Sequence, residues 1–395
     1  QIDLEMSFVD VDDVIAVQEG FVKRLMHEIK GIDIETPIPR MTYHEAMSRF
    51  GSDKPDLRFG YELCDLTELA RGCGFSVFES AAGAGGLVAG INIDGGAKMS
   101  RKEIDSLGEY VKTYRAKGLA WLKVAENGEH SLSFAKFVPV DRLRAIMDRA
   151  GVKPGDLLLC VADSDVELAQ NALGNLRCEV ARRMNVIPEN TWKFLWVVDF
   201  PLFEYGEDDE GNRRLYAKHH PFTAPKDEDL PLFETNPIAM RAKAYDIVLN
   251  GTELASGSIR IHSNDLQQKV FRMLGFTPEQ AQEFVQEALE TFRWHRHATV
   301  DQETYLALHN EHRLIADVVC FPGCHINHLT PRTLDIDRVQ ELMPKYGIEP
   351  KILIEGPPRR EVPVLLRQTS FKALEEPVLF AGEHKGTHTA RFGEI

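Results

Sequence analysis

The residues best suited to chemistry lie in the segment 250–262, NGTELASGSIRIH. Its last five residues alternate polar and apolar side chains, so a strand here would place Ser258, Arg260 and His262 on one face and two isoleucines in the core. A guanidinium fixed on a strand can bind a carboxylate through two parallel hydrogen bonds. Glu253, just upstream, could hold a Mg²⁺ ion on triphosphate oxygens. The segment predicts a site for a carboxylate and a metal-bound phosphate, with a surface ion pair as the alternative.

Two upstream segments carry further candidates. In HHPFTAP (219–225), His219 and His220 precede a proline, and a stiff turn there would point them into a cleft; surface turn histidines are the alternative. The loop at 35–60 is rich in proline and in glycine or Ser-Asp turn signals, which is unusual for a plain linker. Four of its charged residues could serve a site or form structural salt links: Arg49, Asp53, Lys54 and Arg58.

A second chemistry is indicated downstream, in CHINHLTPRTLDID (324–337). His325 and His328 are three residues apart, so on a strand they face opposite ways and only one of them could bind a given metal ion. A non-haem Fe(II) centre needs two histidines and one carboxylate, and Glu394 in the terminal ARFGEI is a candidate for the carboxylate. Surface histidines and an ordinary glutamate are the alternative.

The elements that must position these residues can be read from periodicity. Residues 11–30 predict a helix. Short strands broken by Gly-rich turns are expected over 74–93, with AGAGG (82–86) a turn rather than a phosphate cradle because neither GxGxxG nor GK[ST] is present. A helix capped by Ser100 and stopped by Gly118 follows, then strands at 119–124 and 130–138, a helix at 140–151, a buried strand at 156–163 and a helix at 165–185.

The second half continues with an apolar strand from residue 192 that ends at Pro201 and a hairpin turn at 207–214. A helix over 237–250, the strand 257–262 and helical residues over 264–290 are expected next. After Ala298 the pattern changes to a new series of helices and strands. Eight of the 14 histidines lie beyond residue 292, which also marks a change near residue 280.

Length and composition bound these readings. At 395 residues the chain predicts two or three domains, and 43% hydrophobic residues are ordinary for a soluble globular protein. A net charge of −15 argues against a bulk electrostatic grip on nucleic acid, although a locally basic tRNA surface stays compatible with it. No apolar run approaches the roughly 18 residues of a membrane span. None of the six cysteines forms CxxC, so reduced thiols and a cytoplasmic location are expected.

Residues 1 to about 275 resemble bacterial-type aspartyl-tRNA synthetase, a class II enzyme. The resemblance rests on QIDLEMSF (1–8), RFGSDKPDLRFG (49–60), HHPFTAP, AYDIVLNG (244–251) and GSIRIH (257–262), in order and in spacing. It implies an antiparallel catalytic sheet with an inserted α+β domain of bacterial type. It further implies that Asp3 contacts the substrate amino group, that His219 and Arg260 contact aspartate, and that Glu253 serves ATP with Mg²⁺. The implied partners are aspartate, tRNA and a second copy of the chain. Association with a membrane is not expected.

The implied reaction suits these residue types. The carboxylate of aspartate attacks the α-phosphate of ATP, so the protein must supply alignment, charge stabilisation and a metal ion rather than a covalent nucleophile. A departure is ELASGS (253–258), where the family has more glycine; Ala255 and Ser256 would narrow the approach to the nucleotide.

Residues from about 280 to 395 resemble instead the 2-oxoadipate dioxygenase/decarboxylase family, which has a vicinal-oxygen-chelate-like fold. FPGCHINHLTPRTLDID, IEGPPRR (354–360), RQTSFKALEEPV and ARFGEI carry this resemblance. It implies Fe²⁺ held by His328, with His325 as the alternative, and by Glu394. Arg367 is implied, more weakly, as a binder of a dicarboxylate.

The expected organisation is therefore α+β in four parts: residues 1–72 and 189–280 form the synthetase core, 73–188 the insertion, and 281–395 a partial dioxygenase-like domain. Gln1 lies inside a strand pattern and Ile395 ends without a tail, so both ends are expected to be cut from longer sequences. Three parts of the synthetase family are not found: the first half of its motif 2, its anticodon-binding barrel and its motif 3. One metal-ligand region of the dioxygenase family is also not found. Turnover of either reaction is therefore not expected. The expected function is that of an aminoacyl-tRNA synthetase fragment that activates aspartate and transfers it to tRNA. The alternatives are an Fe(II)-dependent 2-oxoadipate dioxygenase/decarboxylase and a non-functional fusion of two gene fragments.

Overall fold

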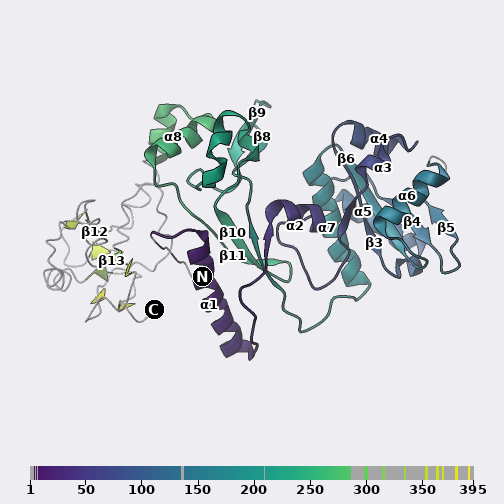
Figure 1. The fold of residues 1–395 in the computed structure, drawn as a ribbon, viewed down its shortest axis with the longest axis horizontal. Helices are drawn as coiled ribbons and strands as arrows, with labels where there is room; N and C mark the ends of the chain where they lie inside the picture. The colour runs from purple at the N-terminus through teal and green to yellow at the C-terminus, as the bar shows by residue number, and fades with distance from the viewer. Residues whose placement is uncertain are drawn as a thin grey trace. The chain divides into compact units, whose positions relative to one another are not determined.

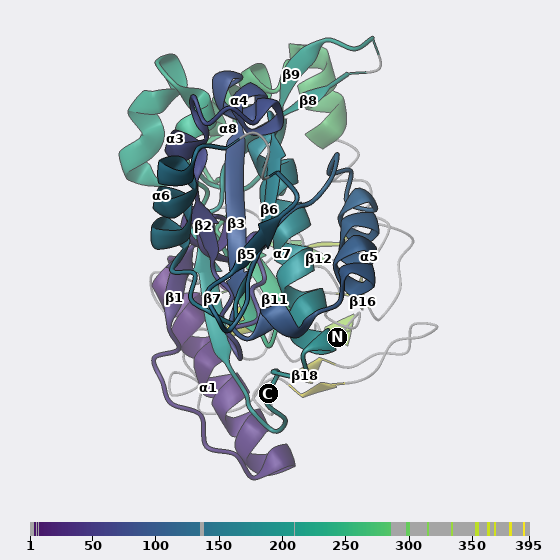
Figure 2. The same cartoon turned by 90° about the vertical axis from the view of Figure 1, so that its right-hand side faces the viewer.

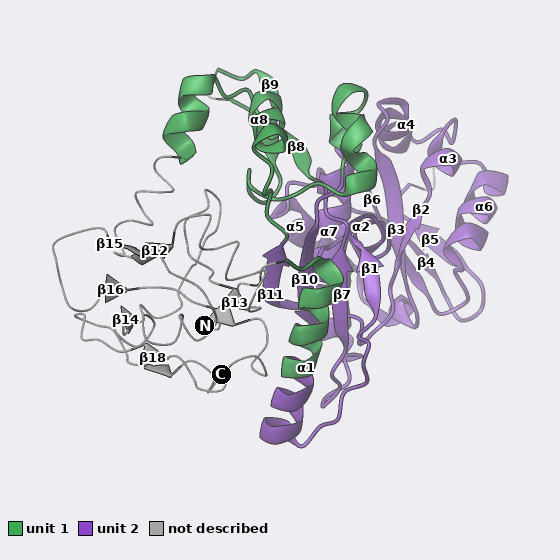
Figure 3. Ribbon diagram, turned by 60° about the vertical axis from the view of Figure 1, so that its left-hand side comes forward, with its two compact units in different colours: residues 1–21, 202–240, 259–395 green, residues 22–201, 241–258 purple. Residues whose placement is uncertain are grey.

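The computed structural model describes residues 8–134, 138–208 and 210–285, with positions 4 and 6 and a few short strands beyond residue 297. Two compact units divide the chain, as Figure 3 shows by colour: residues 1–21, 202–240 and 259–395 form one, and residues 22–201 and 241–258 form the other. Helix α1 (Val11–Lys30) confirms the helix predicted over 11–30. Acidic residues in its first turn and basic residues in its last suit the helix dipole.

The second unit contains a four-stranded sheet in the order β1-β7-β10-β11, of which β10 and β11 are labelled in Figure 1. Its strands are β1 (Arg40–Thr42), β7 (Phe194–Val198), β10 (Ala244–Leu249) and β11 (Thr252–Ser258). The β1–β7 pair is parallel and the other two pairs are antiparallel. Strands β7 and β10 are almost entirely buried, whereas most of β11 is exposed.

The helix predicted over 237–250 is wrong. That stretch forms a short 3₁₀ helix, η3 (Pro237–Ala239), and then the strand β10. Its alanines and lysine favour a helix locally, but β10 hydrogen-bonds to strands on both sides, and this tertiary pairing overrides the local propensity. Asn250 and Gly251 have φ values of 53° and 84° and make a two-residue turn from β10 into β11.

The second unit also contains a five-stranded antiparallel sheet in the order β2-β3-β6-β4-β5. Its strands are β2 (Leu63–Asp65), β3 (Leu87–Ile93), β4 (Ala120–Val124), β5 (His130–Leu132) and β6 (Leu157–Asp163). Figure 2 shows helices on both sides of it: α5 (Arg101–Lys112) and α7 (Val166–Arg183) on one, α3 (Thr67–Ala70), α4 (Ser76–Gly83) and α6 (Val140–Ala150) on the other. Leu157, Leu159 and Val161 pack under the first group, while Leu158 and Cys160 pack under the second. Alternate side chains of β6 thus enter two different cores, one on each face of the sheet. This burial on both faces confirms the predicted buried strand.

Three predictions in this part can be compared with the structure. Ser100 caps α5, as expected, and the structure adds a capping box with Glu103, but the helix ends at Lys112 rather than at Gly118. The strands expected over 74–93 are only half right, because residues 76–83 form α4 and β3 begins at Leu87. Phe78, Ala81 and Ala82 share the buried face of α4, and Gly85, with φ of 78°, makes the turn that AGAGG predicted.

Helix α2 (Tyr43–Phe50) lies against α7 at a pair of glycines. Gly51 ends α2 with φ of 63°, and a Cβ atom on it would lie 2.8 Å from the backbone nitrogen of Gly174 in α7. A Cβ atom on Gly174 would overlap the carbonyl group of Gly51. The two backbones therefore meet where neither residue has room for a side chain.

The first unit contains the hairpin β8 (Phe203–Glu207) and β9 (Arg213–Ala217), which confirms the turn predicted at 207–214. The strand predicted from residue 192 already ends at Val198, because Asp199 has φ of 58° and interrupts the extended chain. The 3₁₀ helix η2 (Asp227–Glu234) and helix α8 (Asn264–Met273) follow, and residues 278–285 are also helical. A cluster of rings lies between these segments: Phe222, Phe271, Phe276 and Phe284.

Beyond residue 297 the description is limited to paired strands. They are β12 (Ala298–Val300) with β15 (Ile352–Ile354), β13 (Leu314–Ile315) with β17 (Arg367–Gln368), β14 (Thr333–Leu334) with β16 (Val362–Pro363), and β18 (Leu379–Phe380) with β19 (Ala390–Arg391). The vicinal-oxygen-chelate-like fold predicted for 281–395 lies outside the described residues apart from these pairs. Within the described part, the four cysteines are free thiols and no helix is long and apolar enough to cross a membrane.

Candidate functional site

The first group of candidate residues lies on the hairpin β10–β11 in the second unit. The strand register places Asp246 opposite Ser256 and Val248 opposite Glu253, with an irregularity between them that leaves Leu254 unpaired. Glu253 is exposed and accepts a hydrogen bond from the Lys54 ammonium, with Nζ 2.9 Å from Oε2. That hydrogen bond raises the pKa of Lys54. The sequence singled out Glu253 as a site candidate but did not identify its partner Lys54, which lies 199 positions away.

Asp246 is the residue that sequence reasoning missed. It is only 5% exposed, and its Oδ1 atom has no hydrogen-bond partner among the described residues. Burial raises the pKa of this carboxyl to about 7, and the negative charges of Glu253 and Asp53 add to the rise. Lys54 opposes it. A signal was present, because Asp246 is the one acidic residue in the apolar run AYDIVL, but a helix assignment hid its burial.

Ion pairs hold the loop that carries Lys54. They show which of its charged residues form structural salt links rather than standing ready for a site. Arg49 binds Glu62 and Glu45, with nitrogen–oxygen distances of 2.8 and 2.6 Å. Arg58 forms a bidentate pair with Asp56, with its nitrogens 2.6 and 3.0 Å from the carboxylate oxygens. These two arginines are salt links of the loop, whereas Lys54 reaches out to the hairpin.

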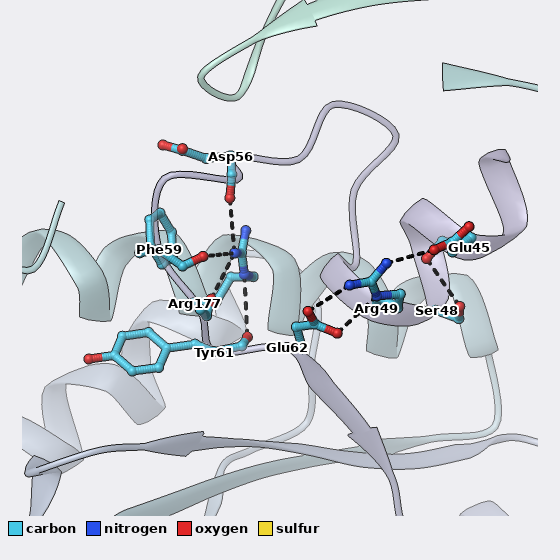
Figure 4. A network of polar contacts seen from close by, with 9 residues as sticks. Glu45, Ser48, Arg49, Asp56, Phe59, Tyr61, Glu62 and Arg177 are labelled. Atoms are coloured by element: carbon cyan, nitrogen blue, oxygen red, sulfur yellow. Dashed lines mark hydrogen bonds and ion pairs between the residues drawn. The ribbon is translucent and has the colours of Figure 1, made fainter. Parts of the chain in front are cut away.

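Arg177 fixes the same loop from helix α7 (Figure 4). Its guanidinium is almost fully buried and donates to the carbonyl oxygens of Asp56, Phe59, Gly60 and Tyr61 at 2.9–3.4 Å. The rings of Phe50 and Phe59 lie 5.0 and 4.4 Å from its central carbon. Burial lowers the pKa of Arg177. The loop that presents Lys54 is therefore held by a buried charge on α7, the helix that packs on the five-stranded sheet.

The second group lies in the first unit, where two distant segments pair. Thr223 and Arg260 form an isolated antiparallel bridge, flanked by hydrogen bonds from Ala224 to Ile259 and from Ile261 to Phe222, each 2.8 Å. The bridge brings HHPFTAP beside SIRIH. Arg260 is half-buried and follows the end of β11, so the strand predicted over 257–262 continues only as this short pairing.

The two histidines differ in their surroundings. The ring of His220 is half-buried, packs 4.9 Å from the ring of Phe222, and its Nδ1 accepts the backbone N–H of the same residue at 3.2 Å. His219 is exposed. Thr223, 2% exposed, has an Oγ1 without a hydrogen-bond partner among the described residues. This segment thus offers an exposed imidazole, a buried hydroxyl and the half-buried Arg260.

The other predicted site residues lie outside the described residues: Asp3, His325, His328, Arg367 as a side chain, and Glu394. Among the described residues no group of three or more His, Cys, Asp or Glu could hold a metal ion by itself. Two carboxylates, Glu253 and Asp246, suit an ion such as Mg²⁺ that takes its remaining ligands from water and phosphate.

Two protein-family models match the chain. A family model of class II tRNA synthetases (D, K and N) matches residues 1–322, and one of 2-oxoadipate dioxygenase/decarboxylase matches residues 252–395. The chain is 49% identical over 351 residues to the aspartate–tRNA ligase of Ruminiclostridium cellulolyticum, covering 87% of this chain and 58% of that protein. It is 48% identical to the aspartate–tRNA(Asp/Asn) ligase of Lachnoclostridium phytofermentans, with the same coverage. The chain thus spans little more than half the length of these relatives. The two matched ranges overlap over 252–322, which includes the predicted boundary near residue 280.

Proposed function

The chain belongs to the class II tRNA synthetases of the D, K and N group, and we propose that its synthetase part activates aspartate with ATP for transfer to tRNA. The observation that carries the proposal is the pairing of residues 222–224 with 259–261, which brings His219 and Arg260 onto neighbouring segments. The names of the relatives support aspartate and tRNA as the substrates. A cytoplasmic location and a homodimer belong to the same proposal.

Arg260 is proposed to select the amino acid. Its guanidinium would bind the side-chain carboxylate of aspartate through parallel hydrogen bonds, and among the described residues it has no hydrogen bond or ion pair that would compete. Asparagine would leave the half-buried guanidinium without a counter-charge, which is a ground for rejection. His219 would contact the same substrate, and Asp3 its amino group.

Mg²⁺ fits the residues of the hairpin β10–β11. The Oδ1 of Asp246 is a buried oxygen without a hydrogen-bond partner among the described residues, and Glu253 offers a second, exposed carboxylate on the neighbouring strand. When bound together with ATP, the ion would neutralise charge that develops on the phosphates. Glu253 and Asp246 would hold it, and Ser256, opposite Asp246, would limit how closely the nucleotide approaches.

A second candidate function is an Fe²⁺-dependent 2-oxoadipate dioxygenase/decarboxylase activity of the C-terminal part. The family match over 252–395 favours it, with His328 and Glu394 as the proposed iron ligands. Oxygen uptake with 2-oxoadipate and Fe²⁺ tests it. The domain boundaries at 72, 188 and 280 stay proposals alongside both functions, and a fusion without function predicts that neither ligand set binds.

Binding of a stable adenylate analogue tests the first proposal without requiring turnover. We expect 5′-O-(aspartyl-sulfamoyl)adenosine to raise the melting temperature, and the asparaginyl and glutamyl analogues to have little effect. Arg260→Met should abolish the response, while Arg272→Met, an exposed arginine of α8, should retain it. Equal responses to all three analogues, or none, would overturn the proposal. Aspartate-dependent ATP–pyrophosphate exchange by the same chain would contradict only the expectation that turnover is not reached.

A further inference from the structure

Among the described residues, Lys54 stands out as a positive group that faces a cluster of three carboxylates, those of Glu253, Asp53 and Asp246. Its Nζ lies 2.9 Å from Oε2 of Glu253 and 3.9 Å from Oδ1 of Asp53. Asp246 interacts electrostatically with Glu253. It is 95% buried, and its Oδ1 has no hydrogen-bond partner among the described residues. One ammonium cannot neutralise all the negative charge of the carboxylates, so the cluster keeps a net negative charge that can attract a further cation.

The ammonium is presented by a backbone that is already fixed. The N–H of Lys54 donates to Oγ of Ser52 at 3.1 Å. Two residues on, Asp56 is held by Arg58 and its carbonyl accepts from Arg177. A Cβ atom on Gly251 would lie only 3.2 Å from Cβ of Asp56, which shows how closely the loop approaches the hairpin turn. The anchored part is the loop backbone, whereas the four-carbon stem of the lysine can turn between partners.

We propose that Lys54 is a resident counter-cation of the nucleotide site, which binds Glu253 while the site is empty and is displaced from it by Mg²⁺ with ATP. The displaced ammonium then pairs with a phosphate oxygen of the same nucleotide. The inference rests on the proposed function, because it uses Glu253 and Asp246 as the Mg²⁺ ligands, and it adds a role for a residue outside that ligand set.

The proposal has a consequence that a merely structural salt link lacks. Without nucleotide, Lys54 competes with a divalent cation for Glu253, so removing its charge should tighten metal binding. With nucleotide, Lys54 contributes a charge to the phosphates, so its removal should weaken binding of the complex. A structural lysine would move both affinities in the same direction or neither. The opposite signs identify the exchange.

The experiment measures Mn²⁺ binding to the full chain by electron paramagnetic resonance, without nucleotide. We expect Lys54→Met to bind Mn²⁺ roughly tenfold more tightly than the parent chain, since it removes a positive charge beside the ion. Adding Glu253→Gln to Lys54→Met should remove this gain. The matched control is Lys117→Met, which deletes another lysine next to a buried carboxylate, Asp163, at 3.5 Å. It should leave Mn²⁺ affinity unchanged.

MgATP binding, measured by calorimetry on the same proteins, gives the second half. Lys54→Met should bind MgATP roughly tenfold more weakly, and Lys117→Met as well as the parent chain. Unchanged Mn²⁺ affinity in Lys54→Met overturns the proposal, and so does MgATP binding that is unchanged or tighter. Failure of aspartyl-adenylate selectivity, in contrast, would overturn the proposed function while leaving the Mn²⁺ result to decide on Lys54.

Discussion

The two ends of the loop that joins α2 to β2 differ in how completely their charged groups are paired. At one end Arg177 is buried, stacked between two rings, and surrounded by four carbonyl acceptors (Figure 4). At the other end Lys54 is half-exposed and shares its charge among carboxylates, one of which, Asp246, has an oxygen without a hydrogen-bond partner in the part of the chain that the structure describes. Complete pairing fixes a backbone, whereas incomplete pairing leaves a place for a ligand. A charged group whose polar atoms are all paired thus indicates a structural role, whereas an unpaired polar atom indicates a place for a ligand.

The largest expected effect is at the arginine end. Arg177→Met should lower the free energy of unfolding by about 4 kcal/mol, because four carbonyls lose their donors and two rings lose their cation. Urea denaturation measures it. The control is Arg182→Met on the same helix, where the side chain is 69% exposed and pairs with Glu179. It should cost under about 1 kcal/mol. Equal losses in the two variants would remove the distinction between the two ends.

Asp246→Asn should act with the opposite sign. The pKa of Asp246 is about 7 in the folded chain, above the ~3.9 of an unfolded aspartate. Between these values the unfolded state binds fewer protons, so the parent chain loses stability as pH rises from about 4 to 7. The asparagine variant should lack this loss and gain about 2 kcal/mol at pH 8, less than the full linkage term because its buried amide also needs partners.

The unfolding free energies of Asp246→Asn and of the parent chain are compared from pH 5 to 8.5 with EDTA present. Asp56→Asn is the matched control, because its carboxylate is equally buried but paired with Arg58. It should destabilise the chain. A loss of stability in Asp246→Asn at pH 8 would mean that the buried carboxylate is satisfied after all.

A smaller effect is expected where the loop meets the hairpin. Gly251 has φ of 84°, so an alanine there costs about 1 kcal/mol from backbone strain and adds a 3.2 Å contact with Asp56. Gly128→Ala isolates the strain, because Gly128 has nearly the same φ of 82° and open space around it. Gly251→Ala should therefore cost more than Gly128→Ala in thermal denaturation. Equal costs would show that the loop yields at this contact.

The smallest effect on stability is expected from Lys54→Met. Its ion pair with Glu253 is 43% and 35% exposed, and exposed pairs contribute roughly 0–1 kcal/mol. We expect a change below about 0.5 kcal/mol in urea denaturation, against the large loss in Arg177→Met. A loss above about 2 kcal/mol would make the lysine end structural like the arginine end.

The sequence predicted features that depend on nearby residues. The N-cap at Ser100, the helix at 11–30 and the hairpin at 207–214 are all encoded within a few positions. It misassigned β10, since strand pairing with β7 and β11 is a tertiary effect. The Asn-Gly turn at 250–251 was the local signal that could have corrected it.

The candidate site was predictable as residue types but not as pairings. Glu253 and Arg260 follow from one segment of sequence, yet Lys54 and Thr223 reach them from distant positions. Arg177 was not singled out, because an arginine on a helix is ordinarily exposed and its burial is visible only in three dimensions.

The glycine contact between α2 and α7 bears on inheritance. Gly51 belongs to the segment that leads into the Lys54 loop, and Gly174 to helix α7, yet each occupies space that the other needs. A crossover that exchanged one segment for that of a distant homologue would succeed only if both partners still lacked a side chain. Helix α7 and the loop that it anchors are thus expected to pass through recombination as one piece.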